Sequence, residues 1–151
     1  MPSSTTSSEP QPDAARVLLV DDNEGMLTRA TTVLKPFCTV VGAVKDGTAA
    51  LTAAQALHPD VIVLDISMPG MNGFEVAGRL RQAGSTAEIV FLTVHDDEDF
   101  VQAARNAGGL GYVTKPRLAT DLVKAIGEVR AHRPFISTGQ ASRPSTVDRR
   151  P

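Results

Sequence analysis

The sequence predicts an α/β fold in which one parallel sheet is covered by helices on both faces. Five short apolar runs occur along the chain, and each is followed by a stretch whose apolar residues recur at helical spacing. This alternation predicts parallel strands, because each helix carries the chain back across the sheet. The 151 residues, 42% hydrophobic but only 4% aromatic, suit one domain built from small aliphatic side chains.

The expected strands are rich in β-branched and aliphatic residues, and most are followed directly by acids or turn-forming residues. They cover residues 17–20, 40–43, 61–64, 89–93 and 111–114. The run at 61–64 is apolar at every position, which predicts burial on both faces, and it ends in Asp65. Pro69, Gly70 and Gly73 then turn the chain away, so Asp65 should lie at the carboxyl edge of the sheet.

The expected helices have apolar residues three or four positions apart and end close to helix-breaking residues. They cover residues 26–34, 47–57, 73–82, 97–107 and 118–131. Pro36 and Pro59 follow the first two helices, and glycines follow the next two. The acidic residues 96–99 lie where the fourth helix begins, and the helix dipole favours negative charge at that end.

The folded domain is expected to span residues 16–131. Residues 1–15 contain mainly Ser, Thr, Pro, Gln and Glu, and we expect a disordered leader because they offer little apolar surface to bury. Residues 132–151 return to a polar composition and are expected to form a flexible tail. The tail is shorter than the roughly 40 residues that a small domain needs, so no output domain is expected.

Composition also narrows the classes of function. The formal net charge of −2 provides no basic surface, so direct binding to nucleic acid is not expected. No apolar run approaches the roughly 18 residues of a membrane span, and no signal peptide is evident, which predicts a cytoplasmic protein without membrane contact. The single cysteine, Cys38, excludes an internal disulfide.

The candidate functional residues come just past the strand ends. Asp21 and Asp22 follow the first strand, Asp65 follows the third, Thr93 ends the fourth and Lys115 follows the fifth. These side chains should meet, because parallel strands end at one edge of the sheet. Clustered carboxylates repel one another and need a cation, and oxygen ligands select a hard one such as Mg²⁺ or Mn²⁺.

Such a site suits phosphoryl transfer. Mg²⁺ commonly takes one or two protein carboxylates plus a phosphate oxygen, which leaves one carboxylate available as a nucleophile. Asp65 is the best placed of the three. The charge of Lys115 and the hydroxyl of Thr93 would hold the oxygens of a phosphoryl group transferred onto Asp65.

Residues 16–130 resemble the receiver domain of two-component response regulators. The resemblance rests on the acidic pair at 21–22, on Asp65 followed by MPGMNG at 68–73, on Thr93, and on Lys115 followed by proline. The segments FLTVHD at 91–96 and RPF at 133–135 are similar to the NarL/FixJ branch. The resemblance implies a flavodoxin-like (βα)5 fold with strand order 2-1-3-4-5. That branch usually carries a helix-turn-helix output domain, and whether this chain is a stand-alone receiver or part of a longer regulator stays open.

The resemblance also implies a role for each residue of the metal site. Asp65 would accept a phosphoryl group from the phosphohistidine of a sensor histidine kinase or of a phosphotransfer protein. Asp22 would bind Mg²⁺ directly and Asp21 through water. Asp65 and the backbone carbonyl of Ser67 would complete the coordination.

A second group of residues would control the phosphorylated state. Thr93 and Lys115 would contact the phosphoryl group, and Tyr112 matches the aromatic switch residue of the family. As the Thr93 hydroxyl moves toward the phosphoryl group, Tyr112 would rotate into the vacated space. Ser67 and His95 would tune the lifetime of the phosphoryl group by controlling the access of water.

The expected output surface consists of the fourth helix, the fifth strand and the last helix. It would bind a partner protein or a second copy of the chain, and the face formed by the first and last helices is the other candidate surface for a homodimer.

Three alternatives compete with a phosphorylated receiver. A Mg²⁺-dependent phosphohydrolase of the haloacid-dehalogenase kind needs an acid two residues after its nucleophile, where this chain has Ser67. A flavodoxin-like cofactor carrier needs a phosphate-binding loop after the first strand, where Asp21 and Asp22 would repel phosphate. A scaffold receiver that is never phosphorylated would not need Asp65, Thr93 and Lys115 together.

Overall fold

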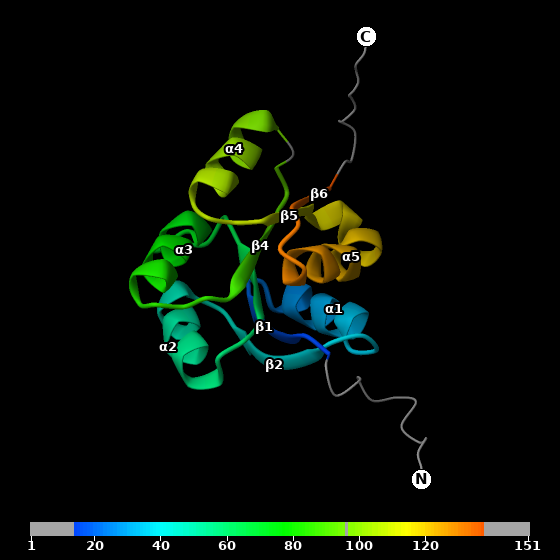
Figure 1. The fold of residues 1–151 in the computed structure, drawn as a ribbon, viewed down its shortest axis with the longest axis horizontal. Coiled ribbons are helices and arrows are strands. Elements are labelled where there is room, and N and C mark those ends of the chain that lie inside the picture. The colour runs from blue at the N-terminus through cyan, green and yellow to red at the C-terminus, as the bar shows by residue number, and fades with distance from the viewer. Residues whose placement is uncertain (1–13, 96, 138–151) are drawn as a thin grey trace.

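The computed structural model describes residues 14–95 and 97–137, which form a parallel sheet between two layers of helices (Figure 1). The strands are β1 (Arg16–Val20), β2 (Thr39–Val44), β3 (Val61–Asp65), β4 (Glu88–Thr93), β5 (Gly111–Thr114) and β6 (Phe135–Ile136). The helices are α1 (Glu24–Leu34), α2 (Gly47–Leu57), α3 (Gly73–Gln82), α4 (Glu98–Asn106) and α5 (Leu118–Arg130), with a 3₁₀ turn, η2 (Lys115–Arg117), before α5. The strand order is β2-β1-β3-β4-β5-β6, which confirms the predicted order 2-1-3-4-5 and adds a sixth strand.

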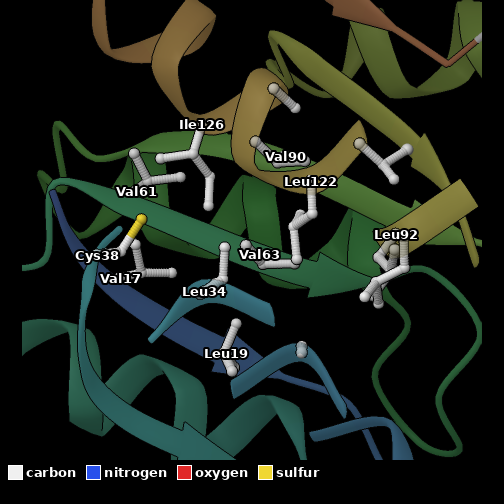
Figure 2. Packing of buried hydrophobic residues seen from close by; sticks show 14 of the residues in the cluster. Val17, Leu19, Leu34, Cys38, Val61, Val63, Val90, Leu92, Leu122 and Ile126 are labelled. Atoms are coloured by element: carbon white, nitrogen blue, oxygen red, sulfur yellow. The ribbon is translucent and has the colours of Figure 1, made fainter. Parts of the chain in front are cut away.

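Both faces of the sheet are buried, because successive side chains of a strand point to opposite sides and helices cover each side. Val17 and Val63 belong to the cluster that packs against α1 and α5, and Figure 2 shows this layer with Leu34, Leu122 and other residues. Leu18, Ile62 and their equivalents on other strands pack against α2, α3 and α4. In Figure 1, α1 and α5 therefore lie side by side, opposite the other three helices.

Side-chain caps fix where the helices that follow the strands begin. Asn23 accepts a hydrogen bond from the Met26 amide at the start of α1, and Asn72 forms a capping box with Glu75 at the start of α3. Asp97 caps α4, as the acidic run predicted, whereas Asp96 lies outside the described residues. The caps thus fix where the loops at the carboxyl edge of the sheet end.

The predicted boundary between domain and tail at residue 131 is wrong for residues 132–137. His132 has a positive φ of 63° and turns the chain back after α5, and β6 then pairs with β5 through Gly111 and Tyr112. Without β6, β5 would be an edge strand with unpaired backbone groups. No sequence pattern predicts this strand, because two residues are too few to show a period.

The N-terminal boundary also differs slightly from the prediction. Ala15 is buried, and its carbonyl accepts a hydrogen bond from the Thr39 amide, so the folded part includes this residue. The rest of the predicted leader, residues 1–13, and of the predicted tail, residues 138–151, lies outside the described residues. Within the described part of the chain, no helix has the length and apolar character needed to cross a bilayer.

Candidate functional site

The candidate site lies where the two central strands end. β1 and β3 are neighbours in register, with Val20 paired to Leu64, so Asp21 and Asp65 come next on adjacent strands. β2 lies on the other side of β1, and the strand order therefore reverses between β1 and β3. At such a reversal the connections leave in opposite directions and open a crevice at the carboxyl edge.

Three carboxylates meet in this crevice. Asp21, Asp22 and Asp65 each have a side-chain oxygen within 4.8 Å of the other two. Asp21 and Asp65 are only 2% and 1% exposed, whereas Asp22 is open to solvent. The Oδ2 atoms of Asp21 and Asp65 are buried and accept no hydrogen bond of good geometry from the described residues, although Asp21 Oδ2 forms an ion pair with Lys115. Buried carboxylate oxygens with free lone pairs are the donors that Mg²⁺ and Mn²⁺ prefer, so these residues fit a divalent cation.

Lys115 brings one positive charge to the three acids. It begins η2, directly after β5, and its Nζ lies 3.2 Å from Asp21 Oδ2 and 3.4 Å from Asp65 Oδ1. The Ser67 amide donates a hydrogen bond of 3.2 Å to the same Asp65 Oδ1. The contacts of the Asp65 carboxylate with Lys115 and with Ser67 thus both involve Oδ1, which leaves Oδ2 as the oxygen available to a ligand.

The environment of Asp65 disfavours its charged form. Burial is the main cause that raises the pKa of Asp65 to about 6, and the neighbouring Asp21 adds to it. The Lys115 ammonium and the Ser67 amide act in the opposite direction without cancelling the effect. The described residues therefore leave ionised Asp65 incompletely compensated, as expected for a carboxylate that shares its site with a cation.

A second group of predicted residues lies at the ends of β4 and β5. Thr93 is buried, and its Oγ1 accepts a hydrogen bond of 3.1 Å from the His95 amide. Tyr112 is also buried, and its hydroxyl donates a 2.9 Å hydrogen bond to the His95 carbonyl. The His95 ring contacts the edge of Phe100, the first apolar residue of α4, with ring centroids 4.0 Å apart. His95 thus connects both expected switch residues to α4.

The structure brings the predicted residues together in two groups. Asp21, Asp22, Asp65 and Lys115 form the first, and Thr93, His95 and Tyr112 form the second. Ser67 touches Asp65 through its amide, so the metal role expected of its carbonyl stays a prediction. The phosphoryl contacts of Thr93 and Lys115, and the roles of Ser67 and His95 in phosphoryl lifetime, also stay predictions.

Sequence reasoning missed a polar cluster beside Lys115. Asp121 is buried on the inner face of α5, where it pairs with Arg117 and Ser137. The spacing of Arg117 and Asp121 is that of an ion pair along a helix and could have been read from the sequence. Ser137 gave no comparable signal, because it lies in a segment that was predicted to be a tail.

Comparisons with known proteins agree with this geometry. Residues 17–127 match the family model for the response regulator receiver domain. The chain is 35% identical over 127 residues to the nitrate/nitrite response regulator protein NarL of Escherichia coli (strain K12), covering 83% of this chain and 59% of that protein. It is 37% identical over 123 residues to the probable transcriptional regulatory protein NarL of Mycobacterium tuberculosis (strain ATCC 25618 / H37Rv), covering 79% and 56%. The chain therefore spans less than two thirds of the length of these relatives.

Two solved structures show the same architecture. A LuxR-family two-component response regulator from Aurantimonas sp. SI85-9A1 superposes with a TM-score of 0.79 at 32% identity, covering 84% of this chain and 92% of that one. The signal receiver domain of the putative response regulator NarL from Mycobacterium tuberculosis gives a TM-score of 0.73 at 34% identity, covering 81% and 100%.

Proposed function

This chain belongs to the response regulator receiver domain family, and on that premise we propose that it accepts a phosphoryl group on Asp65 in a two-component signalling system. One observation carries the proposal. The Asp65 carboxylate is buried beside two other acids, with Oδ1 contacted by Lys115 and Ser67 and with Oδ2 free. An oxygen that is desolvated, anionic and unpaired is a suitable nucleophile toward an electrophilic phosphorus.

The donor is the phosphohistidine of a sensor histidine kinase or of a phosphotransfer protein. Asp65 Oδ2 attacks the phosphorus, and an O–P bond forms as the P–N bond breaks. The electron pair of the broken bond leaves with the imidazole nitrogen, which takes up a proton. The reaction ends when water attacks the same phosphorus, which releases inorganic phosphate and restores the carboxylate. The chain therefore acts as a phosphoacceptor rather than as an enzyme with a separate substrate.

The carboxylates of Asp21 and Asp22, the Asp65 carboxylate through the oxygen that does not bond to phosphorus, and the Ser67 carbonyl would hold Mg²⁺ or Mn²⁺. When bound, such a cation supplies the positive charge that lets these acids and a phosphoryl group share one site. Lys115 Nζ, already beside Asp65, would pair with a phosphoryl oxygen.

The Thr93 hydroxyl would provide a neutral donor. Thr93 Oγ1 accepts a hydrogen bond from the His95 amide, and its own proton makes no hydrogen bond within the described residues. That proton is therefore available to a phosphoryl oxygen.

The same hydrogen bonds suggest how the phosphorylated state would be read out. Movement of the Thr93 hydroxyl toward the phosphoryl group would weaken its bond to His95, which also anchors the hydroxyl of Tyr112 and contacts Phe100. α4 would follow, because Ala104 is its only buried residue in the described structure. The readout surface would then be α4, β5 and α5, available to a partner protein or a second copy, with the α1 and α5 face as an alternative for a homodimer.

The phosphohydrolase alternative is less well supported. The residue two positions after Asp65 is Ser67, whose exposed side chain has no acid to protonate a leaving group.

A receiver that is phosphorylated by a kinase also fits a cytoplasmic protein, which we propose as its location.

Intact-mass spectrometry after incubation with acetyl phosphate and MgCl₂ tests the proposal. We expect one added phosphoryl group on the wild-type protein and none on the Asp65→Asn variant. We also expect none on the wild-type protein in excess EDTA, because the acids would then face the incoming phosphate without a cation. Equal labelling of the variant, or equal labelling in EDTA, would contradict the assignment.

A further inference from the structure

A buried polar network lies beside the lysine of the site and reaches Ser137, directly after β6. Ser137 Oγ donates a hydrogen bond of 2.6 Å to Asp121 Oδ2 and accepts one of 3.2 Å from the Thr114 amide. Arg117 pairs with the same carboxylate through Nε at 2.8 Å and Nη2 at 3.3 Å. The four residues come from β5, η2, α5 and the segment after β6.

The network exists because β6 is short. β6 pairs with β5 only at Gly111 and Tyr112, so Thr114 lies beyond the last residue of β6 and its amide has no backbone acceptor on that strand. The Ser137 hydroxyl takes the place of the missing backbone acceptor. With Asp121 and Ser137 only 4% and 8% exposed, water does not readily replace either partner. Loss of one hydroxyl would thus leave a buried amide and a buried carboxylate oxygen each short of a partner.

Asp121 stays charged in this network. Burial opposes its ionisation, but hydrogen bonds from Arg117, Ser137 and Thr120 together outweigh burial and hold the pKa of Asp121 below its ordinary value. The carboxylate therefore acts as a fixed anionic anchor for Arg117 and not as a proton donor.

The anchor frames Lys115 from both sides. Thr114, directly before Lys115, is held by Ser137, and Arg117, two residues after it, is held by Asp121. The lysine side chain is long and flexible, and its Nζ can stay near Asp21 and Asp65 only if the turn at its base is fixed. Asp121 and Ser137 supply the buried side-chain contacts on both sides of this turn, in addition to the pairing of Thr114 with Thr93 of β4 and the hydrogen bond from Thr120 to the Arg117 carbonyl.

We propose that Asp121 and Ser137 are positioning residues that hold Lys115 for phosphoryl transfer to Asp65, so that the segment directly after β6 controls the reactivity of the site. The inference rests on the proposed function. Drawing Ser137 away from the sheet would release Thr114 and loosen η2, without touching the acids. The effect should therefore fall on the rate of phosphoryl transfer and spare the affinity for the cation.

The test compares four variants of the full chain. Ser137→Ala removes the hydroxyl, Asp121→Asn removes the anchoring charge, and Ser137→Thr keeps a hydroxyl. Val129→Ala, in the buried core of α5, serves as a control that lowers stability without touching the network. Each protein is phosphorylated with acetyl phosphate at saturating Mg²⁺, at a temperature where all are folded. The affinity for Mg²⁺ is measured separately by thermal shift, and amide exchange at residues 114–117 is recorded without phosphate.

We expect phosphorylation to slow about 10-fold in Ser137→Ala and in Asp121→Asn, since a misplaced group away from the reacting atoms can cost this much or more. The Mg²⁺ affinity should change by less than about twofold, and Ser137→Thr and Val129→Ala should both react at about the wild-type rate. Amide exchange at residues 114–117 should become faster in the two slow variants alone.

Three results would overturn the inference. Wild-type rates in both Ser137→Ala and Asp121→Asn would show that the network does not position Lys115. An equally slow Val129→Ala would show that stability alone sets the rate, and an equally slow Ser137→Thr would deny a role to the hydroxyl. If the wild-type protein gains no phosphoryl group, the proposed function is wrong. Amide exchange at residues 114–117 then tests the positioning role separately, and unchanged exchange in Ser137→Ala and Asp121→Asn would refute that role.

Discussion

Replacing Asp65 with asparagine should stabilise the metal-free protein at neutral pH. Burial and Asp21 raise the pKa of Asp65 from 3.8 to about 6, so the ionised carboxylate is less stable in the folded protein than in the unfolded chain. That shift corresponds to at most about 3 kcal/mol at pH 7.5. The Lys115 side chain is 17% exposed, so solvent reaches the site and reduces the destabilisation of the carboxylate. We therefore expect Asp65→Asn to raise the free energy of unfolding by about half of this maximum, roughly 1.5 kcal/mol.

The pH dependence follows from the direction of the shift. The pKa of Asp65 is higher in the folded than in the unfolded protein. Protonated Asp65 therefore contributes its full share of the wild-type stability below about pH 4, and this contribution is lost as the pH rises through about 6. The advantage of Asp65→Asn should therefore be small near pH 4.5 and reach its plateau above about pH 7.

Urea denaturation in EDTA, followed by circular dichroism at several pH values, measures this difference. Asp99→Asn is the matched control, because Asp99 is an exposed acid in the first turn of α4, and its effect should stay within about 0.5 kcal/mol. Addition of Mg²⁺ should stabilise the wild-type protein and much less the Asp65→Asn variant. If Asp65→Asn were less stable than the wild-type protein at pH 7.5 without metal, pairing with Lys115 would outweigh burial and the reasoning would be wrong.

Three further predictions concern the surroundings of Asp65. Gly73→Ala should cost about 2 kcal/mol and slow phosphorylation, because its Cβ would collide with the Asp65 carbonyl, whereas Gly78→Ala in the same helix meets open space and should be neutral or stabilising in chemical denaturation. Tyr112→Phe should cost about 1 kcal/mol and speed amide exchange in α4, because it removes the hydrogen bond to the His95 carbonyl; unchanged exchange there would argue against a role in the switch. Ser67→Ala and His95→Ala should change the half-life of the phosphorylated protein more than its Mg²⁺ affinity, and identical decay curves for both variants and the wild-type protein would reject this role.

The sequence by itself determined the architecture and the main site. Apolar runs and helical periods are local properties, so they predicted five strands, five helices and a parallel sheet without knowledge of the fold. Asp21, Asp65 and Lys115 could be placed together because each ends a strand or directly follows one, and parallel strands end at one edge of the sheet. The approximate place of a site at strand ends is thus contained in the order of residues along the chain.

Only the tertiary structure decided which contacts these residues make. The hydrogen bond between Ser137 and Asp121 joins residues 16 apart, and that between Tyr112 and His95 joins residues 17 apart. No periodicity indicates such pairs, because they depend on how the strands and helices stack. β6 has two residues and no pattern of its own, and it forms because β5 offers an open edge. Local order in the sequence thus predicts the elements, whereas contacts across the sheet arise only when burial brings distant polar groups together and requires that they be paired.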